Sequence, residues 1–160
     1  MSTQNMPPAV GERLPNSALT SSGGQQSTLH GEISAPITIV YFMRTANCPI
    51  CNAHLRKLST EARAGAYLDA RILVIVPGDA SDATKVEARH PDAPLSIRAS
   101  QTAHAEAGLF VKVGFQQSGT FVVDAAATIA LSRVSTVPVG GFDHAAVALV
   151  IAEPASPPRT

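Results

Sequence analysis

The most constraining feature of this chain is an apolar run that leads directly into two closely spaced cysteines and a helical pattern. Ile37 to Met43 is continuously apolar and β-branched, which is typical of a central strand covered on both faces. The segment Cys48-Pro49-Ile50-Cys51 follows, and apolar residues then recur at helical spacing. We therefore expect an amphipathic helix from about Pro49 to about Ala66, with the cysteines at its start and at the carboxyl end of the strand.

The remaining patterns supply partners for this strand and helix. A second buried strand is expected at Arg71–Val76, and Gly23-Gly24 indicates a hairpin turn near the N-terminus. Further strands are expected at Leu95–Ile97, Gly119–Val123 and Thr128–Val134, and further helices at Asp82–His90 with Ser81 as its cap, Thr102–Phe110 and Asp143–Ala152. The last two strands predict an antiparallel hairpin around the turn residue Asp124. This order predicts an α/β fold with a mixed central sheet flanked by helices.

Length and composition indicate one globular domain. The chain has 160 residues, 45% of them hydrophobic and 15% charged, which is enough to bury a core without a structural metal. We expect a flexible N-terminus at residues 1–9, a domain at 10–152, and a disordered tail rich in proline at 153–160.

Charge and hydropathy exclude several classes of partner. The formal net charge is zero and there is no Lys/Arg run, so a nucleic-acid partner is not expected. No apolar stretch approaches the roughly 20 residues needed to span a bilayer. The first thirty residues lack a basic segment followed by an apolar one, so no secretory signal is expected. The sequence thus favours a cytoplasmic protein, where a close cysteine pair is more often catalytic or metal-binding than a permanent cross-link.

The two cysteines have unequal expected environments. Cys48 falls at the cap position, where the unpaired N–H groups of the helix and the nearby charge of Arg44 favour a thiolate. Pro49 suits the first helical turn, because its missing N–H would have no partner there. Cys51 belongs to the apolar stripe and should be shielded, while Cys48 should be partly exposed. Such a pair predicts a nucleophile, Cys48, and a resolving thiol, Cys51. The alternative is two free cysteines with no redox role.

Metal binding is the other chemistry that this spacing allows. Cys48, Cys51 and His54 form a C-x-x-C-x-x-H pattern, but no fourth ligand accompanies them, so we expect neither metal nor cofactor. His54 is expected on the helix surface. The other histidines, expected to be solvated or locally bonded, are His30, His90, His104 and His144.

Several blocks resemble one family in order and spacing. Val10-Gly11-Glu12-Arg13-Leu14-Pro15, then Leu19, resembles the opening of the peroxiredoxins and related redoxins (AhpC/TSA) of the thioredoxin superfamily. The stretch Tyr41–Cys51 looks like the active-site segment of their CPxC-bearing branch. The later blocks that match are Ile72–Pro77, His104–Val113 and Thr120–Asp124. The likeness covers about residues 10–134 and implies a thioredoxin-like fold.

The resemblance also implies roles for individual residues. The attacking cysteine of the family matches Cys48, and its threonine matches Thr45, whose hydroxyl would bond the thiolate and orient a peroxide oxygen. Two residues depart from the family pattern. Tyr41, expected in the core, stands where the family has a proline, and Ser118 stands where it has an arginine. Ser118-Gly119 also offers no proline for the cis-proline loop that is typical of thioredoxins. The sequence leaves open whether Arg44 or Arg98 takes over from that arginine.

These observations predict a peroxiredoxin-like thiol oxidoreductase that reduces peroxides or disulfides through a Cys48/Cys51 dithiol–disulfide cycle. The resemblance implies an external thiol or thioredoxin-type protein as reductant, and dimers are common among such relatives. Two alternatives stay open: a thioredoxin-like disulfide reductase without peroxidase activity, and a non-enzymatic redox-sensing or metal-handling module.

Overall fold

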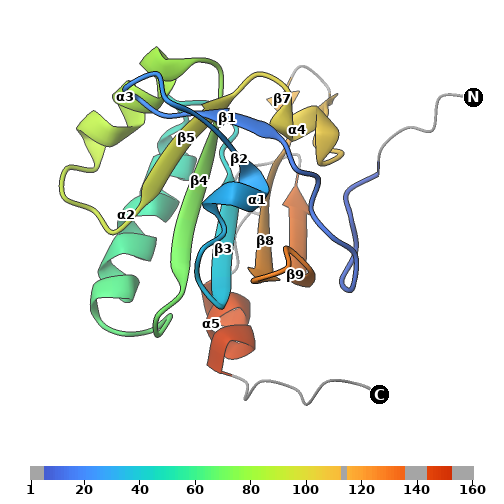
Figure 1. The fold of residues 1–160 in the computed structure, drawn as a ribbon. Coiled ribbons are helices and arrows are strands. Elements are labelled where there is room, and N and C mark those ends of the chain that lie inside the picture. The colour runs from blue at the N-terminus through green and yellow to red at the C-terminus, as the bar shows by residue number, and fades with distance from the viewer. Residues whose placement is uncertain (1–5, 113–114, 136–143, 153–160) are drawn as a thin grey trace, which may run out of the picture.

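Within the described residues, a seven-stranded mixed sheet forms the centre of the molecule (Figure 1). The computed structural model describes residues 6–112, 115–135 and 144–152. The strands are β1 (Ala18–Thr20), β2 (Gln26–Thr28), β3 (Ile37–Phe42), β4 (Arg71–Pro77), β5 (Ser96–Ser100), β6 (Val111–Lys112), β7 (Phe115–Gln116), β8 (Ser118–Asp124) and β9 (Ile129–Ser135). The helices are α1 (Leu29–Glu32), α2 (Pro49–Arg63), α3 (Ala80–Arg89), α4 (Ala103–Glu106) and α5 (His144–Ala152).

The strand order in the sheet is β2-β1-β5-β4-β3-β8-β9. Strand β3 lies parallel to β4 and antiparallel to β8, and β4 lies parallel to β5. Helix α2 connects β3 to β4, so the predicted βαβ unit with the cysteines at the carboxyl end of its first strand is confirmed. The predicted α/β class, a mixed sheet flanked by helices, is also confirmed.

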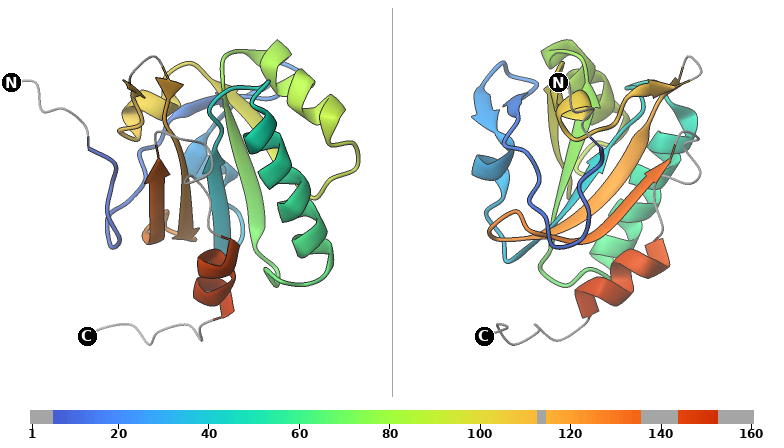
Figure 2. Two further views of the ribbon diagram at one scale, coloured as in Figure 1. Left: turned by 180° about the vertical axis from the view of Figure 1, so that it is seen from behind. Right: turned by 90° about the vertical axis from the view of Figure 1, so that its right-hand side faces the viewer.

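Two apolar cores lie on the two faces of the sheet. Figure 2 shows α2 and α5 on one side and α1 on the other. Because side chains alternate along a strand, Tyr41 faces the core under α2, α3 and α5, while its neighbour Phe42 faces the core under α1 and α4. Both residues are fully buried, which explains why the sequence of β3 is apolar throughout and confirms Tyr41 as a core residue.

Most predicted elements are present with shifted ends. The β8–β9 hairpin and the β1–β2 hairpin around Gly23-Gly24 both form. Asp124 is a turn residue, as predicted, and its carboxylate accepts the N–H groups of Ala126 and Thr128. The predicted helix at Thr102–Phe110 is reduced to the four residues of α4. Gly108 adopts a φ of +76° just beyond it, a conformation typical of residues that follow a helix end.

The predicted cap of α3 was wrong. Asp79, not Ser81, is the N-cap, and its carboxylate accepts the N–H groups of Ser81 and Asp82. The Asp82 carboxylate in turn accepts the Asp79 N–H, which completes a capping box. A carboxylate at this end also interacts favourably with the helix dipole, and the Ser81 hydroxyl donates to it at 2.6 Å.

Some short elements were not predicted from the sequence, and some predicted segments lie outside the described residues. Helix α1 and strands β6 and β7 were not predicted, because segments of two to four residues carry no measurable periodicity. Residues 1–5 of the predicted N-terminus, Asp143 and the predicted tail at 153–160 lie outside the described residues. No helix in the described ranges combines the length and apolar character needed to cross a membrane.

Candidate active site

The two cysteines lie where β3 passes into α2. Two hydrogen bonds hold the backbone of Met43, the residue that follows β3. The Met43 N–H donates to the Ile75 carbonyl at 2.9 Å, and the Met43 carbonyl accepts from His104 Nε2 at 2.7 Å. His104 is buried, which lowers its pKa to about 4 although the bond to Met43 opposes this shift. A neutral His104 therefore holds the strand end beneath the loop that carries Cys48.

Cys48 is the N-cap residue of α2. Its Sγ accepts the N–H of Cys51 at 3.2 Å, and its carbonyl accepts the N–H of Asn52 at 3.0 Å. Cys48 Sγ thus accepts one of the N–H groups that have no partner within the helix, which agrees with its predicted cap position. However, Cys48 is only 5% exposed, which is more buried than expected, because the preceding loop is held against α2 and α3.

Cys51 is fully buried, as predicted, and its Sγ accepts the N–H of Arg44 at 3.4 Å. Burial, with a hydrogen bond to Cys48, raises the pKa of Cys51 to about 11, although bonds from the Tyr41 hydroxyl and the Arg44 N–H oppose this rise. Cys51 is thus a protonated thiol at neutral pH, next to the sulfur of Cys48. The two sulfurs form the unequal pair that disulfide formation requires.

Asn52 links the site to α3, a role that the sequence did not reveal. Its buried side chain donates to the carbonyls of Ala46 at 3.1 Å and Cys48 at 2.9 Å. Its oxygen accepts from His90 Nε2 at 2.8 Å. Burial, and then the charges of Arg56 and Arg89, lower the pKa of His90, so a neutral imidazole donates this bond.

Arg89 holds the same loop from the C-terminal end of α3. Its guanidinium donates to the Ala46 carbonyl at 2.7 Å and to Asn47 Oδ1 at 3.0 Å. Neither Asn52 nor Arg89 belongs to a motif, and only the packing of α3 beside α2 brings them together. The His90 expectation of solvent exposure or local bonding is wrong, because His90 is buried and bonds across 38 residues.

Asn52→Ala is expected to lower the free energy of unfolding by about 2–4 kcal/mol, because three buried hydrogen-bonding partners lose their contact. Chemical denaturation of the reduced protein measures the change. Lys57→Ala, an exposed position on the same helix, should stay within about 0.5 kcal/mol of the wild type. An Asn52→Ala protein as stable as Lys57→Ala would contradict this role.

The other predicted site residues lie at different distances from the sulfurs. Arg44 is half-buried and contacts Cys51 through its backbone N–H, while Pro49 begins α2 as predicted. Thr45 is exposed, and its carbonyl accepts the Cys48 N–H at 3.3 Å; among the described residues its hydroxyl has no hydrogen bond. Ser118 is buried at the start of β8, and its hydroxyl has no partner in the described part of the chain.

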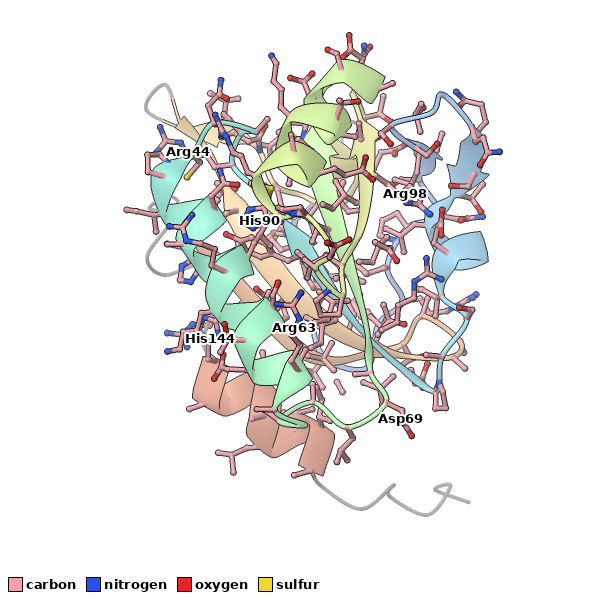
Figure 3. All side chains as sticks on the ribbon, turned by 90° about the vertical axis from the view of Figure 1, so that its left-hand side faces the viewer. Arg44, Arg63, Asp69, His90, Arg98 and His144 are labelled. Carbon is pink, nitrogen blue, oxygen red and sulfur yellow. The ribbon has the colours of Figure 1, made fainter. Side chains whose placement is uncertain are left out.

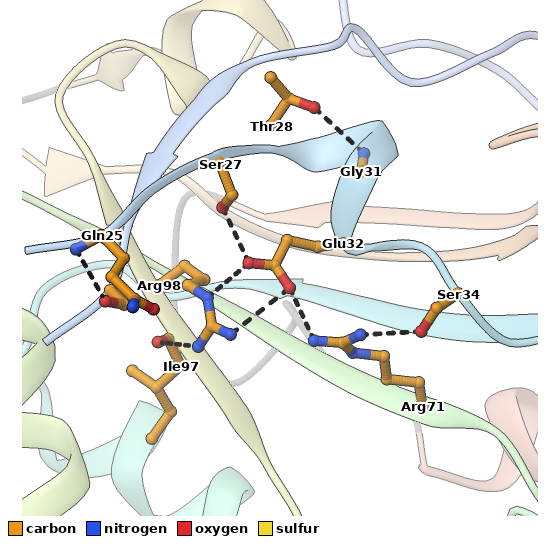
Figure 4. A network of polar contacts seen from close by, with 10 residues as sticks. Gln25, Ser27, Thr28, Gly31, Glu32, Ser34, Arg71, Ile97 and Arg98 are labelled. Carbon is orange, nitrogen blue, oxygen red and sulfur yellow. Dashed lines mark hydrogen bonds and ion pairs between the residues drawn. The ribbon is translucent and has the colours of Figure 1, made fainter. Parts of the chain in front are cut away.

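Arg98 does not reach the cysteines. Its Nε donates to Glu32 Oε2 at 2.6 Å, on the face of the sheet opposite α2 (Figure 4). Figure 3 shows Arg44 and His90 near the N-terminal end of α2 and Arg98 across the sheet. Of the two arginines that the sequence left open, only Arg44 therefore lies at the site.

A second polar cluster lies along α2, away from the cysteines. His54 is half-buried, and its Nδ1 lies 3.3 Å from His144 Nε2. His144 also contacts Glu61 at 2.5 Å, and Glu61 accepts the Tyr67 hydroxyl at 2.9 Å. The expectations of a surface position for His54 and of solvent exposure or local bonding for His144 were therefore wrong, because side chains of α5 and α2 contact each other. In the described residues no group of three or more His, Cys, Asp or Glu side chains is arranged to hold a metal ion.

The fold and the site together define a class of protein. A thioredoxin-like sheet carries two free cysteines, one capping a helix and one buried behind it, which is the arrangement of a thiol-dependent redox protein. The family model described as AhpC/TSA family matches residues 10–132. The chain belongs to the AhpC/TSA family and is a peroxiredoxin-like thiol oxidoreductase. Comparison with curated protein sequences gives no significant match.

Similar solved structures share this fold. A peroxiredoxin-like protein from Aquifex aeolicus has a TM-score of 0.77 and 13% identity, covering 92% of this chain and 88% of its own. Peroxidoxin BcpB from Mycobacterium tuberculosis has a TM-score of 0.70 and 21% identity, covering 89% and 95%. Reduced Prx3 from Vibrio vulnificus has a TM-score of 0.73 and 17% identity, covering 89% and 97%.

Proposed function

We propose that Cys48 is the nucleophile of this oxidoreductase and Cys51 its resolving thiol. The observation that carries this assignment is the N-cap position of Cys48, whose Sγ accepts the N–H of Cys51 at 3.2 Å. A helix N-terminus is a position typical of nucleophilic cysteines, while burial keeps Cys51 protonated. Cys48 is thus placed to attack in the first step, and Cys51 holds the proton that leaves as water in the second.

In the first step the Cys48 thiolate attacks a peroxide oxygen and the O–O bond breaks. The departing alkoxide takes a proton and leaves as an alcohol, or as water from hydrogen peroxide, and Cys48 becomes a sulfenic acid. In the second step the Cys51 sulfur attacks Cys48 Sγ, the S–O bond breaks, and the Cys51 proton leaves with the hydroxyl as water. A Cys48–Cys51 disulfide remains, and an external dithiol or small thiol reduces it.

Three further residues support these steps. We assign the Thr45 hydroxyl to orient the peroxide beside Cys48, since it is exposed and has no bond to another described residue. Arg44 contributes positive charge and the N–H that contacts Cys51 Sγ. Pro49 fixes the first turn of α2, which keeps the N–H groups of that turn directed at Cys48.

The setting of this activity follows from the same reasoning. We propose residues 10–152 as the working domain, a thioredoxin-type protein or small thiol as reductant, a cytoplasmic location and a homodimer as the oligomeric state. Light scattering in both redox states tests the last of these. Peroxide is the proposed oxidising substrate, and a Prx3 from Vibrio vulnificus has been solved in complex with H2O2.

A second candidate function is disulfide reduction without peroxidase activity. Ser118 favours it, because a short neutral side chain stands where the family resemblance implies an arginine that would support the departing oxygen. Stopped-flow mixing with hydrogen peroxide separates the two functions. Oxidation of Cys48 much faster than that of a free thiol supports the peroxidase, whereas oxidation at the rate of a free thiol leaves only the reductase.

Mass spectrometry of the alkylated protein tests the cycle. We expect one equivalent of hydrogen peroxide to protect both Cys48 and Cys51 from alkylation through an intramolecular bridge, and a dithiol to restore both sites. The expected bridged protein is two mass units lighter than the reduced one, about one hydrogen per thiol. Peroxide treatment that leaves both cysteines open to alkylation, or that yields bridges between chains only, would contradict the proposal.

A further inference from the structure

A small hollow lies beside the reactive loop, on the side of α2 that faces α3. Its volume is about 280 Å³, and its lining residues are Asn47, Pro49, Asn52, Arg56 and Arg89. Asn47 and Pro49 directly flank Cys48 in the chain, and Asn52 bonds the Cys48 carbonyl. A ligand in this hollow would therefore lie beside the loop that carries Cys48.

The hollow carries uncompensated positive charge. Arg56 is exposed, and its guanidinium has no hydrogen bond or ion pair with another described residue. Arg89 uses its guanidinium on two neutral oxygens, those of Ala46 and Asn47. In the described part of the chain neither arginine meets a carboxylate, so two cations face one small space.

The guanidinium groups of Arg56 and Arg89 favour an anion whose acceptor oxygens lie in one plane. A guanidinium matches a carboxylate in shape and can donate two parallel N–H bonds to it. The volume lies just below the usual range of cavities for drug-sized ligands, which suits the acidic end of a small molecule. A peroxide is neutral, whereas the reduction of the disulfide is carried out by thiolates, and a positive hollow raises their local concentration.

We propose that this hollow binds the carboxylate of a small acidic thiol and directs its sulfur to Cys48. The proposal deepens the function given above and rests on it. The thiolate attacks Cys48 Sγ, the Cys48–Cys51 bond breaks, and the electron pair leaves on Cys51, which takes a proton. A second thiolate attacks the sulfur of the bound thiol and releases the Cys48 thiolate. Two small thiols are thereby oxidised to one disulfide while the protein disulfide is reduced.

The experiment compares two thiols of equal shape and different charge. The protein is first oxidised with one equivalent of hydrogen peroxide or a chemical oxidant. Reduction by 3-mercaptopropionate and by its neutral amide is then followed by alkylation and mass spectrometry. Each rate is divided by the rate of the same thiol with a neutral small disulfide, which removes the intrinsic difference in reactivity. The corrected rate of the acid divided by that of the amide measures how much the carboxylate of the thiol speeds its reaction with the protein.

We expect the acid to be favoured by the wild type, and Arg56→Gln to lower this preference about three- to fivefold, as loss of one exposed ion pair predicts. Lys57→Gln is the matched control, because it removes a charge from the same helix outside the hollow and should keep the preference. Added NaCl should reduce the preference in the wild type.

The outcomes separate this proposal from the proposed function. A preference that is equal in the wild type and Arg56→Gln, or that falls equally in Lys57→Gln, overturns the assignment of the hollow and leaves the dithiol cycle intact. Failure of the Cys48–Cys51 bridge to form with either oxidant overturns the cycle itself, and with it the role of the hollow.

Discussion

Cys48→Ser is expected to abolish turnover of peroxide or disulfide, with a loss of at least about a thousandfold, because removal of an attacking nucleophile leaves almost no catalysis. The serine hydroxyl fits the N-cap position and accepts the same N–H, so the fold should be retained. It does not ionise near neutral pH, however, and therefore cannot attack. Steady-state peroxide consumption with dithiothreitol as reductant measures the loss, and circular dichroism checks the fold.

Cys51→Ser is the matched control for this prediction. It should react with about one equivalent of peroxide and then stop as a Cys48 sulfenic acid, which a dimedone-type probe traps. A Cys48→Ser protein that keeps turnover, or a Cys51→Ser protein that never reacts with peroxide, would show that the order of attack is reversed or wrong.

The sequence predicted the parts of the fold that depend on long, regular patterns. The seven residues from Ile37 to Met43 form an unbroken apolar run, the residues after Cys48 show helical spacing, and the structure follows both patterns closely. Short elements such as α1 were missed because their stability comes from tertiary contacts rather than from their own sequence. The shift of the α3 cap from Ser81 to Asp79 has a local cause, since α3 begins two residues earlier than the pattern indicated and the Asp79 carboxylate accepts the N–H groups of Ser81 and Asp82.

The site was predictable only where its residues are adjacent in the chain. Cys48, Cys51, Arg44 and Pro49 could be named because the strand-to-helix junction brings them together. Asn52 is also close in sequence, but its role depends on His90, the residue after α3, and the spacing of the two residues does not predict their contact. The burial of Cys48 has the same origin, because the loop before it is hydrogen-bonded by Arg89, which lies far away in the sequence.

The Glu32 network is the other feature that the sequence did not reveal. Glu32 accepts from Arg71 at 2.7 Å, from Arg98 at 2.6 Å and from the Ser27 hydroxyl at 2.8 Å (Figure 4). One carboxylate thus ties α1 to β2, β4 and β5. It also neutralises two arginines whose side chains are only 23% exposed, so its removal leaves both without an anionic partner.

Glu32→Gln is therefore expected to lower the free energy of unfolding by about 2–4 kcal/mol at neutral pH. Breaking a buried ion pair by removing one partner costs about 3–5 kcal/mol, and the partial exposure of the arginines reduces this figure. The amide preserves the volume and one acceptor, so the change reports the charge. Denaturation in urea measures it, and Glu87→Gln, which removes a carboxylate without an ion pair in the described residues, should change stability by less than about 0.5 kcal/mol.

The pH dependence of this difference gives an independent check. Burial alone would raise the pKa of Glu32, but hydrogen bonds from Arg98 and Ser27, with the charges of Arg98 and Arg71, hold it below its ordinary value of 4.5. A carboxyl whose pKa is lowered on folding stabilises the protein above its unfolded pKa, and this stabilisation is lost as the pH falls through the folded value. The wild type should thus lose its advantage over Glu32→Gln as the pH drops below about 4.5, while the difference stays constant from about pH 6 to 8. A difference that is the same at low and neutral pH would mean that shape, not charge, is what Glu32 contributes.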